Sequence, residues 1–318
     1  MNSLIKKILS PKGLWGGYFY VCRKMKIDRY LSDKTYLNLL WRSRTGKSMK
    51  WENPQTYNEK MQWLKVYYHR PDLTRLVDKY EAKMYTDNVL GPGHTFPLLG
   101  VWDNPEDIDF NSLPNEFVLK CTHNSAEGMA FCKDKEKGIY TGAHGHDKTI
   151  LSKEQVIAGL SKAMKDSYYL KSREWPYKNV KPRIIAEKLM KSDDGDVLKD
   201  YKFFCFDGDP KFIWVGSNFD PMWFNVMTAD WKNLHCKWGY YDLGPENITP
   251  PGNLEEMLEV ARTLSKGLPH VRIDLYTIDN TIYLGEYTFF THGGLADFEP
   301  ESFDKFFGDF INLPEPIQ

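Results

Sequence analysis

Cysteine is scarce in this chain: there are five residues in 318, an odd number, with no C-x-x-C pair. This usage argues against a disulfide framework or a zinc knuckle and fits a reducing cytoplasm. Long apolar runs are also missing, since no stretch approaches the roughly 18–20 residues needed to span a bilayer. The start, "MNSLIKKILSPKGLWGGYFYVCRK", lacks the apolar core and cleavage site of a signal peptide. We therefore expect a cytoplasmic protein that is neither secreted nor membrane-spanning.

An excess of charge of either sign is missing as well. Lysine and arginine number 42 and aspartate and glutamate 43, for a net charge of -1. This balance excludes a chain-wide basic surface for nucleic acid, so any function that depends on charge must be local. With 42% hydrophobic and 27% charged residues, and no internal repeat, the chain is typical of a globular protein large enough for two or three packed lobes.

The N-terminal segment combines apolar and basic residues. One side carries Leu4, Ile5, Ile8 and Leu9, and the other carries Lys6, Lys7 and Lys12. Two interpretations stay open: peripheral contact with an anionic membrane surface, and a terminal helix docked on the body of the protein.

The first half of the chain predicts helices followed by a hairpin. Residues 1–80 place apolar side chains three to four positions apart, which is typical of helices. Strand 117–121 and the apolar segment 129–132 predict a hairpin. Ser152 with Gln155 predicts a capping box for a helix that runs through Tyr169.

The second half predicts further hairpins with helices between them. After a strand at 183–190, a hairpin turns at Asp207–Gly208. Asn253 is predicted to cap a helix that stops at Gly267, and a last hairpin turns around Asp279–Asn280. Strands that arrive mainly as hairpins favour an α+β fold with antiparallel sheets over a doubly wound parallel fold.

The last hairpin makes a testable prediction about pairing. If its loop is the three residues Asp279–Thr281, then Asp274 lies directly across from Glu286 and Arg272 across from Thr288, all on one face. A two-residue turn would shift the pairing by one and place the two carboxylates on opposite faces. Opposed carboxylates repel unless a cation lies between them, and Mg²⁺ takes such oxygen ligands. The alternative is a solvated sheet face with no ligand.

A second candidate feature is the stretch "FVLKCTHNSAEGMAF", residues 117–131. Strand alternation turns Phe117 and Leu119 to one side and Lys120 to the other, where it emerges beside a small polar loop. An ammonium there is well placed for phosphate oxygens, and the loop offers backbone N–H donors although it holds only Gly128. The Walker pattern G-x-x-x-x-G-K-[ST] is absent.

These segments together carry a family resemblance. "FVLK" with its loop, "IIAEKLM", "DYKFFCFDGDPKF" and "RIDLYTIDNTIYLGEYTFFTHGG" resemble, in order, the strands of the ATP-grasp superfamily. "NPQTYNEKMQWLK", "LVDKYEAKMY" and "PLLGVWDNPEDIDFNSLPNEFVLKC" are similar to the TupA-like ATP-grasp proteins of bacterial surface-polysaccharide clusters. The resemblance covers about Leu40 to Leu313 and implies two lobes with antiparallel sheets that clamp a nucleotide. The implied division is a helical region at 1–80, a first lobe at 81–186 and a metal-bearing lobe at 187–318.

The resemblance also implies roles for individual residues. The nucleotide would be bound by Lys120 at its phosphates, by the loop residues His123, Ser125 and Gly128, by the hinge residues Glu187, Lys188 and Leu189 at adenine and ribose, and by Lys202. Magnesium would be bound by Asp274, Glu286 and Thr288. The implied catalytic residues are Arg272, which meets the transferred phosphate, and Lys202.

Three departures from the family pattern stand out. Thr288 replaces the usual asparagine and offers a single hydroxyl oxygen, the loop "SAEG" is poor in glycine, and "GAHGHD" resembles an insertion. His144 and His146 in that insertion form an H-x-H pair, which we interpret as loop residues because no carboxylate or cysteine set of regular spacing accompanies them.

The function implied by the resemblance is an ATP- and Mg²⁺-dependent ligase that joins an amine or amino acid to a carboxylate through an acyl phosphate. The carboxylate would be a uronic acid of a capsule or other surface polysaccharide, or of its precursor, handled in the cytoplasm or at the inner face of the membrane. Two alternatives stay open: a phosphotransferase or glycosyltransferase acting on the same polymer, and a nucleotide-binding relative without catalysis.

Overall fold

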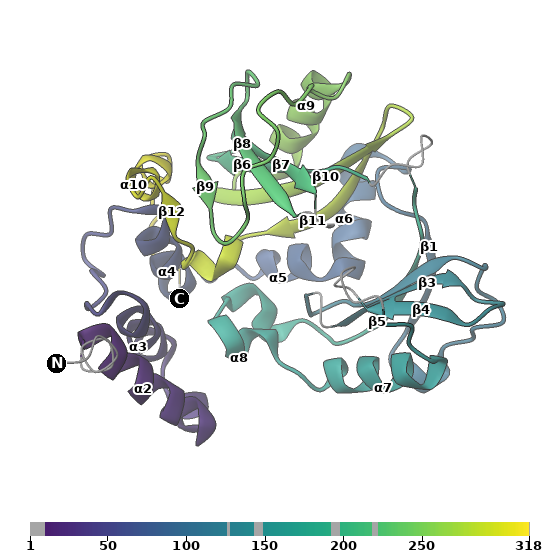
Figure 1. The fold of residues 1–318 in the computed structure, drawn as a ribbon, viewed down its shortest axis with the longest axis horizontal. Coiled ribbons are helices and arrows are strands. Elements are labelled where there is room, and N and C mark those ends of the chain that lie inside the picture. The colour runs from purple at the N-terminus through teal and green to yellow at the C-terminus, as the bar shows by residue number, and fades with distance from the viewer. Residues whose placement is uncertain (1–9, 126–127, 143–148, 192–197, 218–221, 318) are drawn as a thin grey trace.

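The chain folds into two antiparallel sheets and a helical N-terminal part (Figure 1). The computed structural model describes residues 10–125, 128–142, 149–191, 198–217 and 222–317. The apolar and basic residues at positions 4–9 and the H-x-H pair at 144–146 lie outside these ranges. The predicted α+β architecture with antiparallel sheets is confirmed.

The N-terminal part is helical, as the apolar spacing predicts. Its elements are α2 Pro11–Lys24, η1 Ile27–Tyr30, α3 Asp33–Thr45, α4 Tyr57–Tyr67, α5 Asp72–Val77 and α6 Lys79–Leu90. Thr56 and Glu59 form a capping box that fixes the start of α4. Figure 1 shows α2 and α3 together at one corner of the molecule, away from both sheets, whereas α5 and α6 lie between them.

The first sheet has the strand order β1-β5-β2-β3-β4. The strands are β1 Leu98–Trp102, β2 Phe117–Cys121, β3 Met129–Asp134, β4 Ile139–Gly142 and β5 Ile184–Lys188, and the short helix η2 Pro105–Asp107 follows β1. Phe117 and Leu119 are fully buried in a core that includes Val156 and Leu160 of α7, Lys153–Met164. Lys120 points out of that core, as the strand alternation predicts.

The helix that follows β4 is shorter than predicted. Its capping box, Ser152 with Gln155, is confirmed, but α7 ends at Met164 and a separate helix α8, Tyr168–Ser172, follows, with η4 at Trp175–Asn179. The prediction of one helix through Tyr169 is wrong because Asp166 and Ser167 interrupt it. These residue types compete for backbone hydrogen bonds, and Ser167 takes an extended backbone conformation.

The second sheet has the order β11-β10-β6-β7-β8, with α9 Leu254–Ser265 packed against it. Its strands are β6 Asp200–Phe206, β7 Asp209–Ser217, β8 Trp223–Thr228, β10 His270–Ile278 and β11 Thr281–Thr288. Asp207 and Gly208 both have positive φ, so the predicted tight hairpin is confirmed. The side chain of Asn253 does not cap α9; its amide donates instead to Thr277 and to the Asn280 carbonyl, which ties the helix start to the last hairpin.

The helix α4 joins the N-terminal part to the second sheet. The remaining elements around it are β9 Lys237–Trp238, η5 Thr291–Gly294, β12 Phe298–Glu299 and α10 Ser302–Gly308. The hydroxyl of Tyr57 lies 3.0 Å from Nε2 of His270, whose Nδ1 lies 3.0 Å from the Cys205 carbonyl oxygen. Burial lowers the pKa of His270 to about 3, so the ring is neutral, donates from Nδ1 and accepts from the tyrosine.

Within the described ranges, every helix is too short or too polar to cross a membrane.

Candidate active site

The pairing of β10 with β11 brings the predicted acidic pair together. Asp274 lies across from Glu286, and Arg272 lies across from Thr288, as predicted. The predicted three-residue loop is wrong, however: Ile278 pairs with Thr281, which leaves a two-residue turn. The register is restored by a β-bulge, described next.

The bulge is at Gly285, the extra residue between the pairs Leu275–Leu284 and Asp274–Glu286. Because one added residue reverses the facing of everything beyond it, the bulge returns Glu286 to the face of Asp274. A turn of two residues followed by a bulge therefore gives the same pairing as a turn of three.

Gly285 has no room for a side chain. An added Cβ would lie 2.7 Å from Cε2 of Tyr276 and 3.3 Å from the Asp274 carbonyl oxygen. We expect Gly285→Ala to lower the free energy of unfolding by about 1–3 kcal/mol, the usual effect of overpacking, as measured by urea denaturation. The matched control is Gly252→Ala, whose Cβ would meet nothing within 4 Å. Equal losses in the two variants would contradict this account of the bulge.

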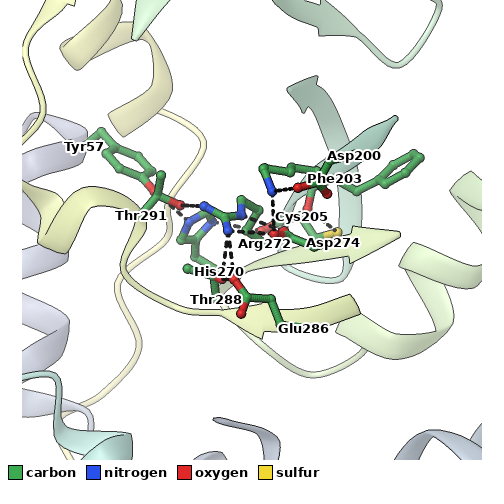
Figure 2. A network of polar contacts seen from close by, with 11 residues as sticks. Tyr57, Asp200, Phe203, Cys205, His270, Arg272, Asp274, Glu286, Thr288 and Thr291 are labelled. Carbon is green, nitrogen blue, oxygen red and sulfur yellow. Dashed lines mark hydrogen bonds and ion pairs between the residues drawn. The ribbon is translucent and has the colours of Figure 1, made fainter. Parts of the chain in front are cut away.

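Arg272 lies at the centre of the polar network in Figure 2. Its Nε donates to Oδ1 of Asp274 at 2.6 Å, and its Nη1 lies 3.3 Å from the hydroxyl of Thr291. Its Nη2 is surrounded by three oxygens: Asp274 Oδ2 at 2.7 Å, Thr288 Oγ1 at 3.0 Å and Glu286 Oε1 at 3.3 Å. The guanidinium is thus the cation that separates the two carboxylates in this structure.

Lys202 on β6 completes the network from the other side of Asp274. Its ammonium lies 2.9 Å from Oδ2 of Asp274 and also pairs with Asp200. Burial alone would raise the pKa of Asp274, but Arg272 and Lys202 outweigh it and hold that pKa below its usual range. Buried charges of alternating sign therefore keep Asp274 ionised.

The oxygens around Nη2 of Arg272 are those of the three predicted metal ligands. Mg²⁺ takes hard oxygen donors and commonly uses one or two carboxylates together with water and phosphate oxygens. Asp274, Glu286 and Thr288 supply such a donor set, already converging on one cationic atom, so these residues fit the metal. The described residues contain no cluster of three or more His, Cys, Asp or Glu that could hold an ion by protein groups alone.

A pocket between the two sheets brings residues of both lobes together. It encloses about 420 Å³ of empty space, counting the part open to solvent. Lys120 and Glu187 line it from the first sheet, and Gly285 and Glu286 from β11. Lys120 and Glu286 thus share one pocket, whereas Asp274, Arg272 and Lys202 are not among its lining residues.

Glu187 is the buried anion that holds the basic side of this pocket together. Its carboxylate lies 2.5 Å from the ammonium of Lys120 and also pairs with Lys83. Burial alone would raise the pKa of Glu187, but the two ammonium groups outweigh it and hold the pKa at about 2. Lys120 is held in place at the pocket wall by a partner that stays ionised.

Two lysines on α6 belong to this site although the sequence interpretation did not select them. Lys79 and Lys83 both line the pocket, and Lys79 donates to the Asn124 carbonyl at 2.5 Å. Burial lowers the pKa of both lysines. Their i, i+4 spacing in "LVDKYEAKMY" places them on one helix face, a signal that could have identified them as a pair.

The predicted loop residues His123, Ser125 and Gly128 are not among the residues that line the pocket. His123 is buried beside the backbone of Ala163 and Asp166 at the end of α7, and burial lowers its pKa. Ser125 is exposed, and its carbonyl accepts from the N–H of Gly128 at 3.1 Å. A Cβ on Gly128 would lie 2.7 Å from Cβ of Cys121, so glycine is needed there for close packing. The rest of the loop, 126–127, lies outside the described residues.

The two hinge positions after Glu187 stand at the end of β5. Lys188 is exposed, and its backbone N–H donates to the Pro97 carbonyl at 3.0 Å; Leu189 is partly buried. Neither is among the residues that line the pocket.

Two antiparallel sheets that enclose a pocket with a strand lysine on one side and a paired carboxylate on the other agree with the ATP-grasp class. The model of the TupA-like ATP-grasp family matches residues 59–312, so the chain belongs to this family. The predicted family and fold are confirmed by this match.

Three of the solved structures similar to the chain are two ligases and a synthetase, at low identity. D-alanine–D-alanine ligase from Bacillus anthracis, complexed with ATP, has 14% identity and a TM-score of 0.40 over 80% of this chain and 70% of that one. The same enzyme from Helicobacter pylori has 17% identity and a TM-score of 0.37 over 69% of this chain and 55% of that one. N5-carboxyaminoimidazole ribonucleotide synthetase from Thermus thermophilus has 11% identity and a TM-score of 0.37 over 67% of this chain and 45% of that one.

The chain thus spans about half the length of two of these three proteins. No curated protein matches it.

Proposed function

We propose that the protein is an ATP-dependent carboxylate–amine ligase. In this reaction ATP phosphorylates a carboxylate, and an amine then displaces phosphate from the acyl phosphate. The observation that carries the proposal is the pocket lined by Lys120 and Glu187 on one sheet and by Glu286 on the other, in a chain of the TupA-like ATP-grasp family. The ligases and synthetases among the similar structures agree with this class of reaction.

The proposed roles follow from where the charges lie. Lys120, with Lys79 and Lys83 beside it, would bind the nucleotide phosphates, and Glu187, Lys188 and Leu189 would bind the adenine and ribose. Arg272 and Lys202 would stabilise the negative charge that spreads over the transferred phosphoryl oxygens. Asp274, Glu286 and Thr288 would hold Mg²⁺, which supplies further neutralisation of phosphate charge.

The proposed substrates are a uronic acid of a surface polysaccharide or its precursor and an amine or amino acid. The proposed setting is the cytoplasm, at the inner face of the membrane. We also propose the division predicted from the sequence, with a helical region at 1–80, a first lobe at 81–186 and a metal-bearing lobe at 187–318.

The test has two stages. Melting temperature is first measured with Mg²⁺ and ATP, ADP or neither, and we expect stabilisation by both nucleotides. Uronic acids and amines are then added in pairs, with ADP release and mass spectrometry of the products as readouts. ADP with an amide product supports the proposal.

Three other results would each overturn the ligase proposal. A phosphorylated sugar without an amide indicates a phosphotransferase. Turnover of a sugar nucleotide indicates a glycosyltransferase. Stabilisation by ATP without ADP release in any mixture indicates a nucleotide-binding protein, the interpretation that Thr288 in place of asparagine favours.

A further inference from the structure

The helix α2 has two apolar faces, and among the described residues only one of them is covered by other parts of the chain. Trp15 and Phe19 face α3, where Phe19 packs edge-on against Tyr36 with ring centroids 5.3 Å apart and Arg42 lies over the Trp15 ring. A second row of side chains, at spacings of four, three and four, points to solvent. It consists of Leu14 (56% exposed), Tyr18 (55%), Val21 (49%) and Met25 (65%). We call these four residues the exposed α2 stripe.

The stripe lies within an unusual concentration of exposed apolar surface. Tyr20, Ile27 and Tyr30 are also exposed, at 64%, 42% and 91%. Seven of the 15 exposed large hydrophobic side chains among the described residues therefore fall between positions 14 and 30. Single exposed apolar residues are ordinary, but a row of them along one face of a helix marks a surface that another body covers.

Basic residues are concentrated in the same segment as this apolar surface. Residues 11–30 contain five basic side chains, Lys12, Arg23, Lys24, Lys26 and Arg29, against the single acid Asp28. Asp28 is buried and lies 4.0 Å from Arg23. The chain as a whole is nearly neutral, so this corner is locally cationic. The preceding residues 1–9 add two lysines and four Leu or Ile to the sequence.

We propose that the exposed α2 stripe docks the protein on the surface of an anionic lipid bilayer. The stripe enters the boundary between headgroups and acyl chains, while the lysines and arginines of the same segment are attracted to the lipid phosphates. Figure 1 shows that α2 lies at a corner of the molecule, so this contact leaves both sheets and their pocket clear of the membrane. The inference does not depend on the ligase reaction.

The charges argue against a second copy of the chain as the occupant. In a symmetric dimer that buries both stripes, the two cationic segments 11–30 would lie close together, and like charges at an interface are unfavourable. A neutral bilayer would bury the apolar residues but leave the basic ones without partners. An anionic surface satisfies both kinds of residue.

The test uses the full chain and co-sedimentation with vesicles of phosphatidylcholine alone or with an equal share of phosphatidylglycerol. We expect binding to the anionic vesicles, without any need for ATP. The triple variant Leu14→Ser, Val21→Ser, Met25→Ser should bind them roughly tenfold more weakly or worse. Its matched control replaces three exposed apolar residues elsewhere, Val89→Ser, Ile150→Ser and Leu243→Ser (40%, 62% and 44% exposed), and should bind like the natural protein.

A second variant tests the charge contribution separately. Lys12→Glu, Lys24→Glu, Arg29→Glu should weaken anionic binding roughly a hundredfold. Circular dichroism and ATP-dependent melting show whether each variant is folded. If the stripe variant does not fold, the charge variant alone tests the proposal. The proposal is overturned if the natural protein does not bind anionic vesicles, if it binds neutral ones equally, or if the stripe variant instead dissociates a dimer in light scattering.

Discussion

Replacing Asp274 with asparagine is expected to lower the free energy of unfolding by about 3 kcal/mol and to abolish Mg²⁺-dependent nucleotide turnover. The side chain is buried and accepts from Arg272 through both oxygens and from Lys202 at 2.9 Å. Removing its negative charge leaves the buried cations Arg272 and Lys202 with one carboxylate fewer to neutralise them. Removing one partner of a buried ion pair typically costs about 3–5 kcal/mol. Urea denaturation measures the first effect and ADP release the second.

The control for this variant is Asp242→Asn. That carboxylate pairs with Lys237 at 2.9 Å but is 84% exposed, so its replacement should leave stability unchanged. If Asp274→Asn unfolds at the same urea concentration as the natural protein, the buried ion pairs of Asp274 do not contribute to stability. If it retains Mg²⁺-dependent turnover, the metal role of Asp274 is wrong.

Glu286→Gln should separate function from stability. The Glu286 side chain is 43% exposed and lines the pocket, and its only ion-pair contact in the network is at 3.3 Å from Arg272. Because solvent screens such a contact, we expect little change in stability. The loss of one of two proposed metal carboxylates should reduce turnover roughly a hundredfold or more.

Measurement of ADP release across a range of Mg²⁺ concentrations checks this prediction. A lost metal ligand should raise the Mg²⁺ concentration needed for half-maximal rate. The matched control Glu246→Gln removes a carboxylate that is 66% exposed and lies outside the site, and should behave like the natural protein. An unchanged Mg²⁺ dependence in Glu286→Gln would exclude a metal at the hairpin.

The last hairpin shows how far local reasoning reaches. The pairing of Asp274 with Glu286 was predictable because strand alternation and antiparallel register are short-range properties. The route to that pairing was not, because a turn of two residues with a bulge and a turn of three residues give the same register. The bulge is identified by the close packing of Gly285 against the Tyr276 ring. This packing is a contact between two strands, so local reasoning does not reveal it.

Helix boundaries show the same division. The capping boxes at Thr56 and Ser152 follow from spacing alone, because the two partners lie three residues apart. Asn253 is a good cap by residue type, yet its amide is used to reach the 277–280 turn. When a side chain has two possible hydrogen-bond partners, the segment that packs against it in the folded protein determines which one it uses.

The sequence by itself determined the succession of helices and hairpins, the outward facing of Lys120, and the identity of the residues at the acidic hairpin, since each depends on spacings of a few residues. Only the tertiary structure decided that Lys79 and Lys83 join Lys120 around Glu187, that His123 lies against α7, and that Arg272 occupies the point where three oxygens converge. These are contacts between segments far apart in the chain, and packing and buried charge, rather than local propensity, select them.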